Sequence, residues 1–184
     1  MVAGALTHWC NAQTLFNGLM DGVLPQVQVP VDQFEIARHD VVLCAQLKSS
    51  FALCLYDEVQ EGGALLHMQI GRPGRTADPE LTDNTLSTNL LLLDKCIEEL
   101  RHSDPRARHW QAKFVAHADE RNGGRELALG VQSFVEAYLE DVGFGLVSAA
   151  VHCDESLNLS FRPSMGQLRC EPAAATTQRL QKIT

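Results

Sequence analysis

Several features that define large classes of protein are missing from this chain of 184 residues. No apolar run reaches the ~18–20 residues needed to cross a bilayer, and residues 1–23 contain neither Lys nor Arg, so we expect no membrane insertion and no secretory signal. Basic residues form no cluster and the net charge is −8, which disfavours nucleic acid and anionic membranes as partners. The chain also has no glycine-rich phosphate loop, which disfavours nucleotide binding.

Closely spaced cysteines are missing too. Zinc sites usually contain close-spaced Cys or His pairs, and disulfide scaffolds are shorter and denser in cysteine. The six cysteines of this chain contain no C-x-x-C pair. We therefore expect reduced thiols in a cytoplasmic protein, with no metal and no cofactor. The cysteines are Cys10, Cys44, Cys54, Cys96, Cys153 and Cys170.

The composition that remains is that of a globular domain, with 45% apolar and 21% charged residues. Residues 41–56 are rich in Val, Leu, Phe and Cys and predict two strands, separated by the polar step Lys48-Ser49-Ser50. Apolar residues at three- and four-residue spacing predict one helix after Asp83 and a second over residues 131–142. Further strands are predicted at residues 64–70, 112–116, 146–152, 157–161 and 167–170.

These elements do not alternate strictly as strand, helix, strand. We therefore expect an α/β (α+β) layered sandwich, in which a mixed β-sheet packs against helices. Residues 71–79 contain two Gly and two Pro and predict a loop. Asp57, Glu58 and Glu61 predict a solvated hairpin turn.

One segment indicates chemistry. The run LKSSFALCLYD at residues 47–57 is followed by Gly62-Gly63 and then His67. An apolar strand, a glycine-rich turn and a histidine beyond it can bring a nucleophile and its base together. Ser50 and His67 are therefore the candidate nucleophile and base.

These residues resemble the chemoreceptor glutamine deamidase (CheD) family, whose pattern is approximately L-G-S-C-V-A-V-C-L-Y-D followed by G-G-x-x-H. Residues 112–118 resemble the family's A-K-x-F-G-G-A strand, and residues 161–166 resemble its F-x-P-x-T-G hairpin. The resemblance covers residues 28–171. Residues 1–27 are then an N-terminal extension with a short helix, and residues 172–184 a flexible tail.

The resemblance implies a CheD-like cysteine hydrolase fold and a role in chemotaxis. Enzymes of this family hydrolyse the side-chain amide of particular glutamines on chemoreceptors, with a cysteine thiolate as nucleophile, a histidine as base and an assisting threonine. These positions correspond to Ser50, His67 and, for the threonine, a place at or near Cys44. The implied partners are the cytoplasmic domain of chemoreceptors and a CheC-type phosphatase.

The departures from the family pattern fall at the site itself. Ser50 replaces the nucleophilic cysteine, Lys48 replaces the preceding glycine, and Ala116-His117 replaces a Gly-Gly pair. A thiol has a pKa of ~8.5 that a neighbouring imidazolium lowers further, whereas a serine hydroxyl needs a positioned base and a prepared oxyanion site. Lys48 is expected to make this turn more rigid, because glycine at the same position would allow the backbone more conformations.

Several interpretations of the site stay open. The chain is a CheD-type protein whose deamidase step is weakened or lost, or an active protein-glutamine amidohydrolase that uses Ser50 or Cys44 with His67, or a binding partner of a CheC-type phosphatase without catalysis. Strand alternation would place Cys44 and Ser50 on one face if the strand were unbroken.

Structural interpretations compete with these functional ones. Cys44 and Cys54 suit small core positions, and His67 suits a core or edge histidine. His117 and His152 would either line the same cleft as His67 or lie at a surface or turn. A chance match by an unrelated α/β domain is the remaining alternative.

Overall fold

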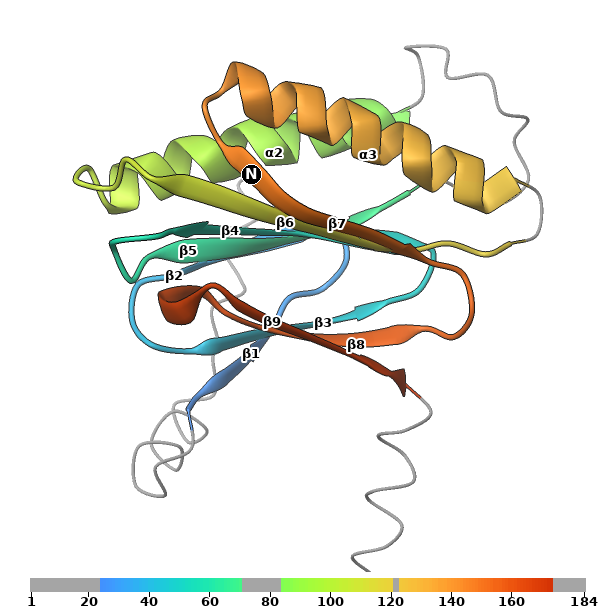
Figure 1. Ribbon diagram of the computed structural model, residues 1–184, viewed down its shortest axis with the longest axis horizontal. Coiled ribbons are helices and arrows are strands. Elements are labelled where there is room, and N and C mark those ends of the chain that lie inside the picture. Colours follow the sequence, from blue (N-terminus) through green and yellow to red (C-terminus); the bar gives the residue numbers. More distant parts are fainter. Residues whose placement is uncertain (1–23, 71–83, 121–122, 174–184) are drawn as a thin grey trace, which may run out of the picture.

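Two β-sheets and two long helices form three layers in the computed structural model, which describes residues 24–70, 84–120 and 123–173 (Figure 1). The helices cover one face of a five-stranded sheet, and a four-stranded sheet packs on its other face. This is the predicted α+β layered sandwich, with two sheets where one was expected. The predicted N-terminal helix, the loop at residues 71–79, the cap at Asp83 and the tail beyond residue 173 lie outside the described residues.

The five-stranded sheet has the order β2-β5-β4-β6-β7. Its neighbours are antiparallel, except for β6 and β7, which are parallel. The central strand β4 is buried on both faces, which explains its nearly continuous apolar sequence. The strands are β2 (Gln33–Ala37), β4 (Ser50–Asp57), β5 (Gly63–Gln69), β6 (Trp110–His117) and β7 (Gly145–His152).

The four-stranded sheet has the order β1-β3-β8-β9, in which β1 is parallel to β3 and the other pairs are antiparallel. Along β8, buried Leu157, Leu159 and Phe161 alternate with half-buried residues, as expected when one face of a strand meets a core. The strands are β1 (Gln26–Gln28), β3 (Val42–Leu47), β8 (Leu157–Arg162) and β9 (Gln167–Pro172); a short 3-10 turn, η2 (Pro163–Met165), links β8 to β9.

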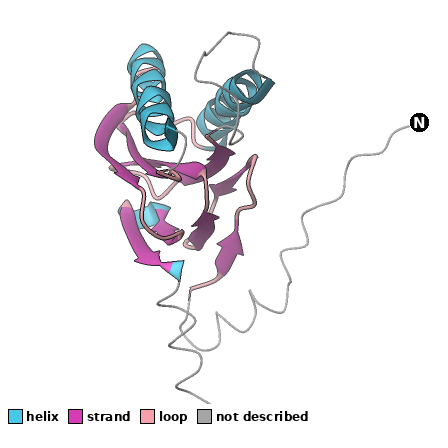
Figure 2. Cartoon of the chain, turned by 90° about the vertical axis from the view of Figure 1, so that its right-hand side faces the viewer, coloured by secondary structure: helices cyan, strands magenta, loops and turns pink. Residues whose placement is uncertain are grey.

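Helices α2 (Asn84–Ser103) and α3 (Gly124–Asp141) lie on the same side of the five-stranded sheet, as Figures 1 and 2 show. Leu93 and Leu100 of α2, and Val135 and Leu139 of α3, bury against that sheet. Helix α3 begins seven residues earlier than predicted. No helix among the described residues is long and apolar enough to span a membrane.

Three predicted features needed correction. Strands β1 and β2 were not predicted, and β6 extends beyond the predicted residues 112–116 at both ends. The acidic turn is not wholly solvated, because Asp57 is only 3% exposed. Its carboxylate accepts hydrogen bonds from four backbone N–H groups, those of Val59 (2.8 Å), Gln60 (2.8 Å), Arg108 (2.9 Å) and His109 (2.6 Å).

Several motif residues hold the sheets together. Lys113 of β6 donates a hydrogen bond of 2.6 Å to the carbonyl of Gly166, beyond η2, and its ammonium lies 5.4 Å from the centre of the Tyr56 ring. A side chain at Gly63 would come 2.7 Å from Cβ of Pro163, so glycine permits the close approach of β5 to η2. These contacts bring together residues from three segments that resemble the CheD pattern.

Candidate functional site

The candidate nucleophile lies where the chain passes from one sheet to the other. Strand β3 of the four-stranded sheet ends at Leu47, and β4 of the five-stranded sheet begins at Ser50. Only Lys48 and Ser49 connect them, and Ser49 has a positive φ of 50°. A non-glycine residue in this region is uncommon and costs of order 1–2 kcal/mol. The strained residue is therefore Ser49, and not Lys48, which replaces the glycine of the family pattern.

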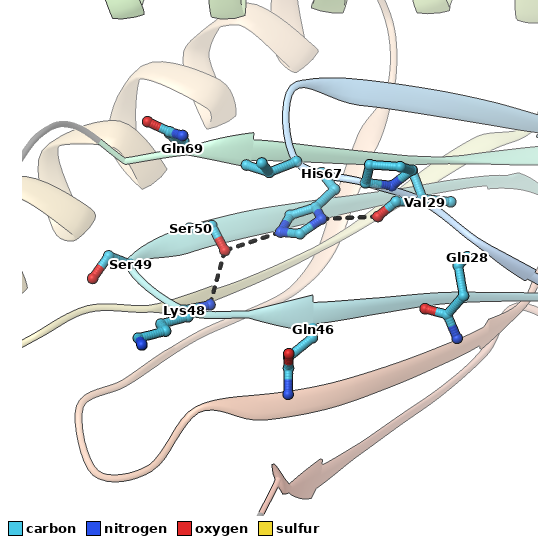
Figure 3. A pocket seen from close by; sticks show the side chains of 10 residues that line it. Gln28, Val29, Gln46, Lys48, Ser49, Ser50, His67 and Gln69 are labelled. Carbon is cyan, nitrogen blue, oxygen red and sulfur yellow. Dashed lines mark hydrogen bonds between the residues drawn. The ribbon is translucent and has the colours of Figure 1, made fainter. Parts of the chain in front are cut away.

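Ser50 and His67 form a hydrogen-bonded pair. The Oγ atom of Ser50 lies 3.0 Å from Nε2 of His67, and Nδ1 of His67 lies 2.9 Å from the carbonyl oxygen of Val29 (Figure 3). Because a carbonyl can only accept, Nδ1 carries the hydrogen, and in the neutral ring Nε2 is the acceptor. Ser50 therefore donates its hydroxyl proton towards His67, which is the arrangement of a nucleophile and a general base.

Burial sets the protonation state of this histidine. His67 is 5% exposed and Ser50 only 2%. Burial lowers the pKa of His67, and the Val29 carbonyl and the charge of Asp32 oppose that shift in part. His67 is therefore neutral near pH 7 and can accept a proton. No carboxylate of the described part of the chain bonds to Nδ1, so a backbone carbonyl takes the orienting position that an aspartate occupies in serine hydrolase triads.

One backbone donor points at the nucleophile. The N–H of Lys48 donates a hydrogen bond of 3.0 Å to Oγ of Ser50. The next N–H, that of Ser49, instead donates a hydrogen bond of 3.2 Å to Nδ1 of His117. The N–H of Lys48 is thus a backbone donor close enough to the nucleophile to meet the oxyanion of a substrate attacked by Ser50.

The pair opens into a cleft of about 530 Å³. Among the described residues, the lining contains neutral amides and one cation, Lys48, and no carboxylate, although the chain carries a net charge of −8. Figure 3 shows the side chains around the cleft. They belong to Gln28, Val29, Pro30, Val31, Gln46, Lys48, Ser49, Ser50, His67 and Gln69.

Cys44 is not part of this arrangement. Its neighbours Leu43 and Ala45 belong to the core between the sheets, so Cys44 projects from the other face of β3. Its Sγ atom lies 3.9 Å from Oγ of Ser160 in β8. The suggested common face with Ser50 is wrong, because the strand breaks at Lys48 and the chain changes sheets.

Cys44 is expected to react slowly with iodoacetamide near neutral pH. It is 7% exposed, and burial raises the pKa of its thiol, which Ser160 offsets only in part. Cys153, which is half-buried, should be alkylated before Cys44. Peptide mapping by mass spectrometry would measure the order. If Cys44 were alkylated fastest, a reactive thiol would exist at this position after all.

The other histidines and several lining residues differ from expectation. Neither His117 nor His152 lines the cleft. The carbonyl of Val29 and the amides of Gln28, Gln46 and Gln69 were not predicted, since a backbone carbonyl and scattered glutamines leave no recognisable sequence pattern. Cys54 is fully buried, as its core interpretation predicted. Among the described residues, no group of three or more His, Cys, Asp or Glu side chains could hold a metal ion.

Comparisons with known proteins add little to this geometry. No family model matches the sequence, and no curated protein matches it. Among solved structures, the chain is similar to a Neisseria meningitidis protein, NMB0706, described by the family model DUF152. The two chains are 10% identical, with a TM-score of 0.46, over 75% of this chain and 67% of that one. No chemistry follows from a similarity this slight.

Proposed function

We propose that this protein is a CheD-type chemotaxis protein that binds the cytoplasmic domain of chemoreceptors and hydrolyses glutamine side chains there only slowly. The observation that carries the proposal is the Ser50–His67 hydrogen bond of 3.0 Å. The resemblance assigns the nucleophile and the base to these two positions, seventeen residues apart in sequence. Their contact at the mouth of a cleft supports that assignment.

The reaction would proceed by acyl transfer. Oγ of Ser50 attacks the carbon of the glutamine amide while its proton moves to Nε2 of His67. The resulting oxyanion meets the N–H of Lys48. When the tetrahedral species collapses, the C–N bond breaks and His67 returns its proton to the departing nitrogen, which leaves as ammonia. Water then attacks the ester on Ser50 while His67 takes its proton. When the bond between the acyl carbon and Oγ breaks, His67 returns that proton to Oγ, which gives glutamate and free serine.

Three features would keep this reaction slow. A serine hydroxyl ionises far less readily than a thiol. The imidazolium formed on His67 is stabilised by the Val29 carbonyl and not by a carboxylate hydrogen bond. In the described ranges, only one backbone N–H is directed at the nucleophile. These features support the weakened deamidation of the proposal.

The lining of the cleft suits an amide-bearing ligand. Gln28, Gln46 and Gln69 offer both donors and acceptors that can pair with a glutamine side chain, and Lys48 attracts acidic residues beside it. In our proposal a CheC-type phosphatase would compete with the receptor for the same surface.

A binding experiment with the cytoplasmic fragment of a chemoreceptor tests the proposal. Wild-type protein and Ser50→Ala should bind equally. Lys48→Glu should weaken binding at least about tenfold, because it reverses the charge of the one charged side chain among the described residues that line the cleft. Lys95→Glu is the matched control, since Lys95 lies on α2, in another layer, and pairs with Glu99. Calorimetry would measure the affinities. Binding that Lys48→Glu leaves intact, or no binding at all, would contradict the proposal.

A further inference from the structure

A second buried histidine lies beside the nucleophile turn. His117 is the last residue of β6, pairs directly with Ser50 across the β4–β6 ladder and is only 7% exposed. It does not line the cleft, and the reaction proposed above does not use it. In the family pattern that the chain resembles, a glycine stands at this position, so the imidazole is a property of this chain.

The hydrogen bonds of His117 define its tautomer. Its Nδ1 atom accepts the N–H of Ser49 at 3.2 Å. Because a backbone N–H can only donate, Nδ1 has no hydrogen and Nε2 carries it. Nε2 is buried. The ring is held through Nδ1 by the hydrogen bond from Ser49.

Ser49 is held from both sides. Its carbonyl accepts the N–H of Ile70, just beyond β5, at 3.3 Å, while its N–H is held by His117 of β6. These two bonds fix the peptide groups around the residue whose φ is +50°. The conformation of Ser49 determines where Ser50 begins β4, and so where Oγ meets Nε2 of His67 and the N–H of Lys48.

We infer that His117 is a positioning residue: its neutral imidazole holds Ser49 in the left-handed conformation and thereby places the Ser50 hydroxyl against His67. The two strands that flank β4 then each contribute one histidine. His67 of β5 bonds to the nucleophile Ser50, and His117 of β6 bonds to Ser49 in the turn before it. The consequence for catalysis rests on the proposed function. The control of the turn by His117 does not.

Protonation of His117 would release the turn, because an N–H at Nδ1 would then face the N–H of Ser49. The groups that act on the ring are Asp119 after β6, His152 on β7 and the backbone of Asp154. Burial lowers the pKa of His117, Asp119 and the Asp154 backbone oppose that shift, and His152 adds to it. The bond is therefore intact at neutral pH and lost as the pH falls through the folded-state pKa of His117.

Two substitutions separate the hydrogen bond from the titration. Asparagine places a carbonyl oxygen close to the position of Nδ1 and does not titrate, so His117→Asn should retain the bond at every pH. His117→Ala removes the acceptor. Hydrogen exchange of the Ser49 amide, followed by NMR and corrected for the intrinsic effect of pH, reports on the bond directly. His102→Ala, at the exposed end of α2, is the control for loss of a histidine.

We expect the Ser49 amide to be protected in the wild type near pH 7 and to lose protection in acid. His117→Asn should stay protected throughout, and His117→Ala should exchange at least about tenfold faster, as loss of one hydrogen bond predicts. Equal protection of Ser49 in wild type and His117→Ala would overturn the inference. If His117→Ala does not fold, the pH dependence in wild type and its absence in His117→Asn decide the question.

Reactivity at position 50 provides a second measurement. In a Ser50→Cys background, His117→Ala should slow alkylation of the thiol several-fold, and His117→Asn should restore it. If Ser49 protection follows this pattern while no variant hydrolyses a receptor glutamine, the proposed function fails and the role of His117 stands. Unchanged alkylation in His117→Ala would mean that the turn does not position residue 50.

Discussion

Replacing Ser50 by cysteine is expected to raise the rate of glutamine-amide hydrolysis by at least about a hundredfold, because a thiolate forms readily beside an imidazole whereas an alkoxide does not. The partners of a thiolate are already present. Nε2 of His67 lies 3.0 Å from Oγ of Ser50, and the N–H of Lys48 points at the same atom. Sulfur is larger than oxygen, but the cleft of about 530 Å³ leaves room on its open side.

Mass spectrometry of receptor fragments measures this gain, since deamidation replaces an amide NH2 by OH. The activity of Ser50→Cys should disappear in Ser50→Cys/His67→Ala, because His67 is the base whose Nε2 atom is hydrogen-bonded to the side chain at position 50. Alkylation of the new thiol should be faster than that of Cys54, which is fully buried and whose pKa burial raises. A Ser50→Cys protein with a reactive thiol and no hydrolysis would show that the cleft does not present an amide to the nucleophile.

Asp57→Ala is expected to lower the free energy of unfolding by about 3 kcal/mol or more, since it leaves four backbone N–H groups without their acceptor. Two of them belong to the turn after β4 and two to the segment that enters β6. The carboxylate therefore joins a hairpin to a neighbouring strand that lies 51 residues further along the chain. Urea denaturation measures the change. Glu58→Ala, the exposed carboxylate next to it, should change the stability by less than about 0.5 kcal/mol.

The contribution of Asp57 should depend on pH in a defined direction. Burial raises its pKa, but the hydrogen bonds from Gln60, Val59, His109 and Arg108 outweigh burial and lower the pKa overall. A carboxyl whose folded-state pKa is depressed stabilises the protein fully above its unfolded-state pKa of ~3.9. That stabilisation is lost as the pH falls through the folded-state value. The difference between wild type and Asp57→Ala should thus be constant near neutrality and shrink in acid. A difference that grows in acid would contradict this account.

Local sequence patterns were sufficient to predict much of the fold. The predictions lie close to the observed positions for the two strands around Lys48-Ser49-Ser50, for strand β5 and for helix α2. In each of these elements the apolar residues recur at the spacing typical of its secondary structure. Strands β1 and β2 were missed although apolar and polar residues alternate in both, because each run is short and Pro25 and Pro30 interrupt this part of the sequence. β1 is three residues long and polar at both ends, and it is a strand only because β3 supplies its hydrogen bonds. Pairing of this kind depends on residues far away in the sequence.

The chain alone determined that position 50 holds a hydroxyl where the resembling pattern has a thiol, that His67 follows it at the spacing of a base, and that the domain mixes strands and helices. Only the tertiary structure decided which side chains meet. It joined Ser50 to His67, oriented that ring on the carbonyl of Val29, buried His117 against Ser49, and placed Cys44 on the far face of its strand. The reason is physical: the chain changes sheets at Lys48 and Ser49, so alternation along the sequence does not relate side chains before this step to side chains after it. Strand pairing across the sheet decides which of them meet.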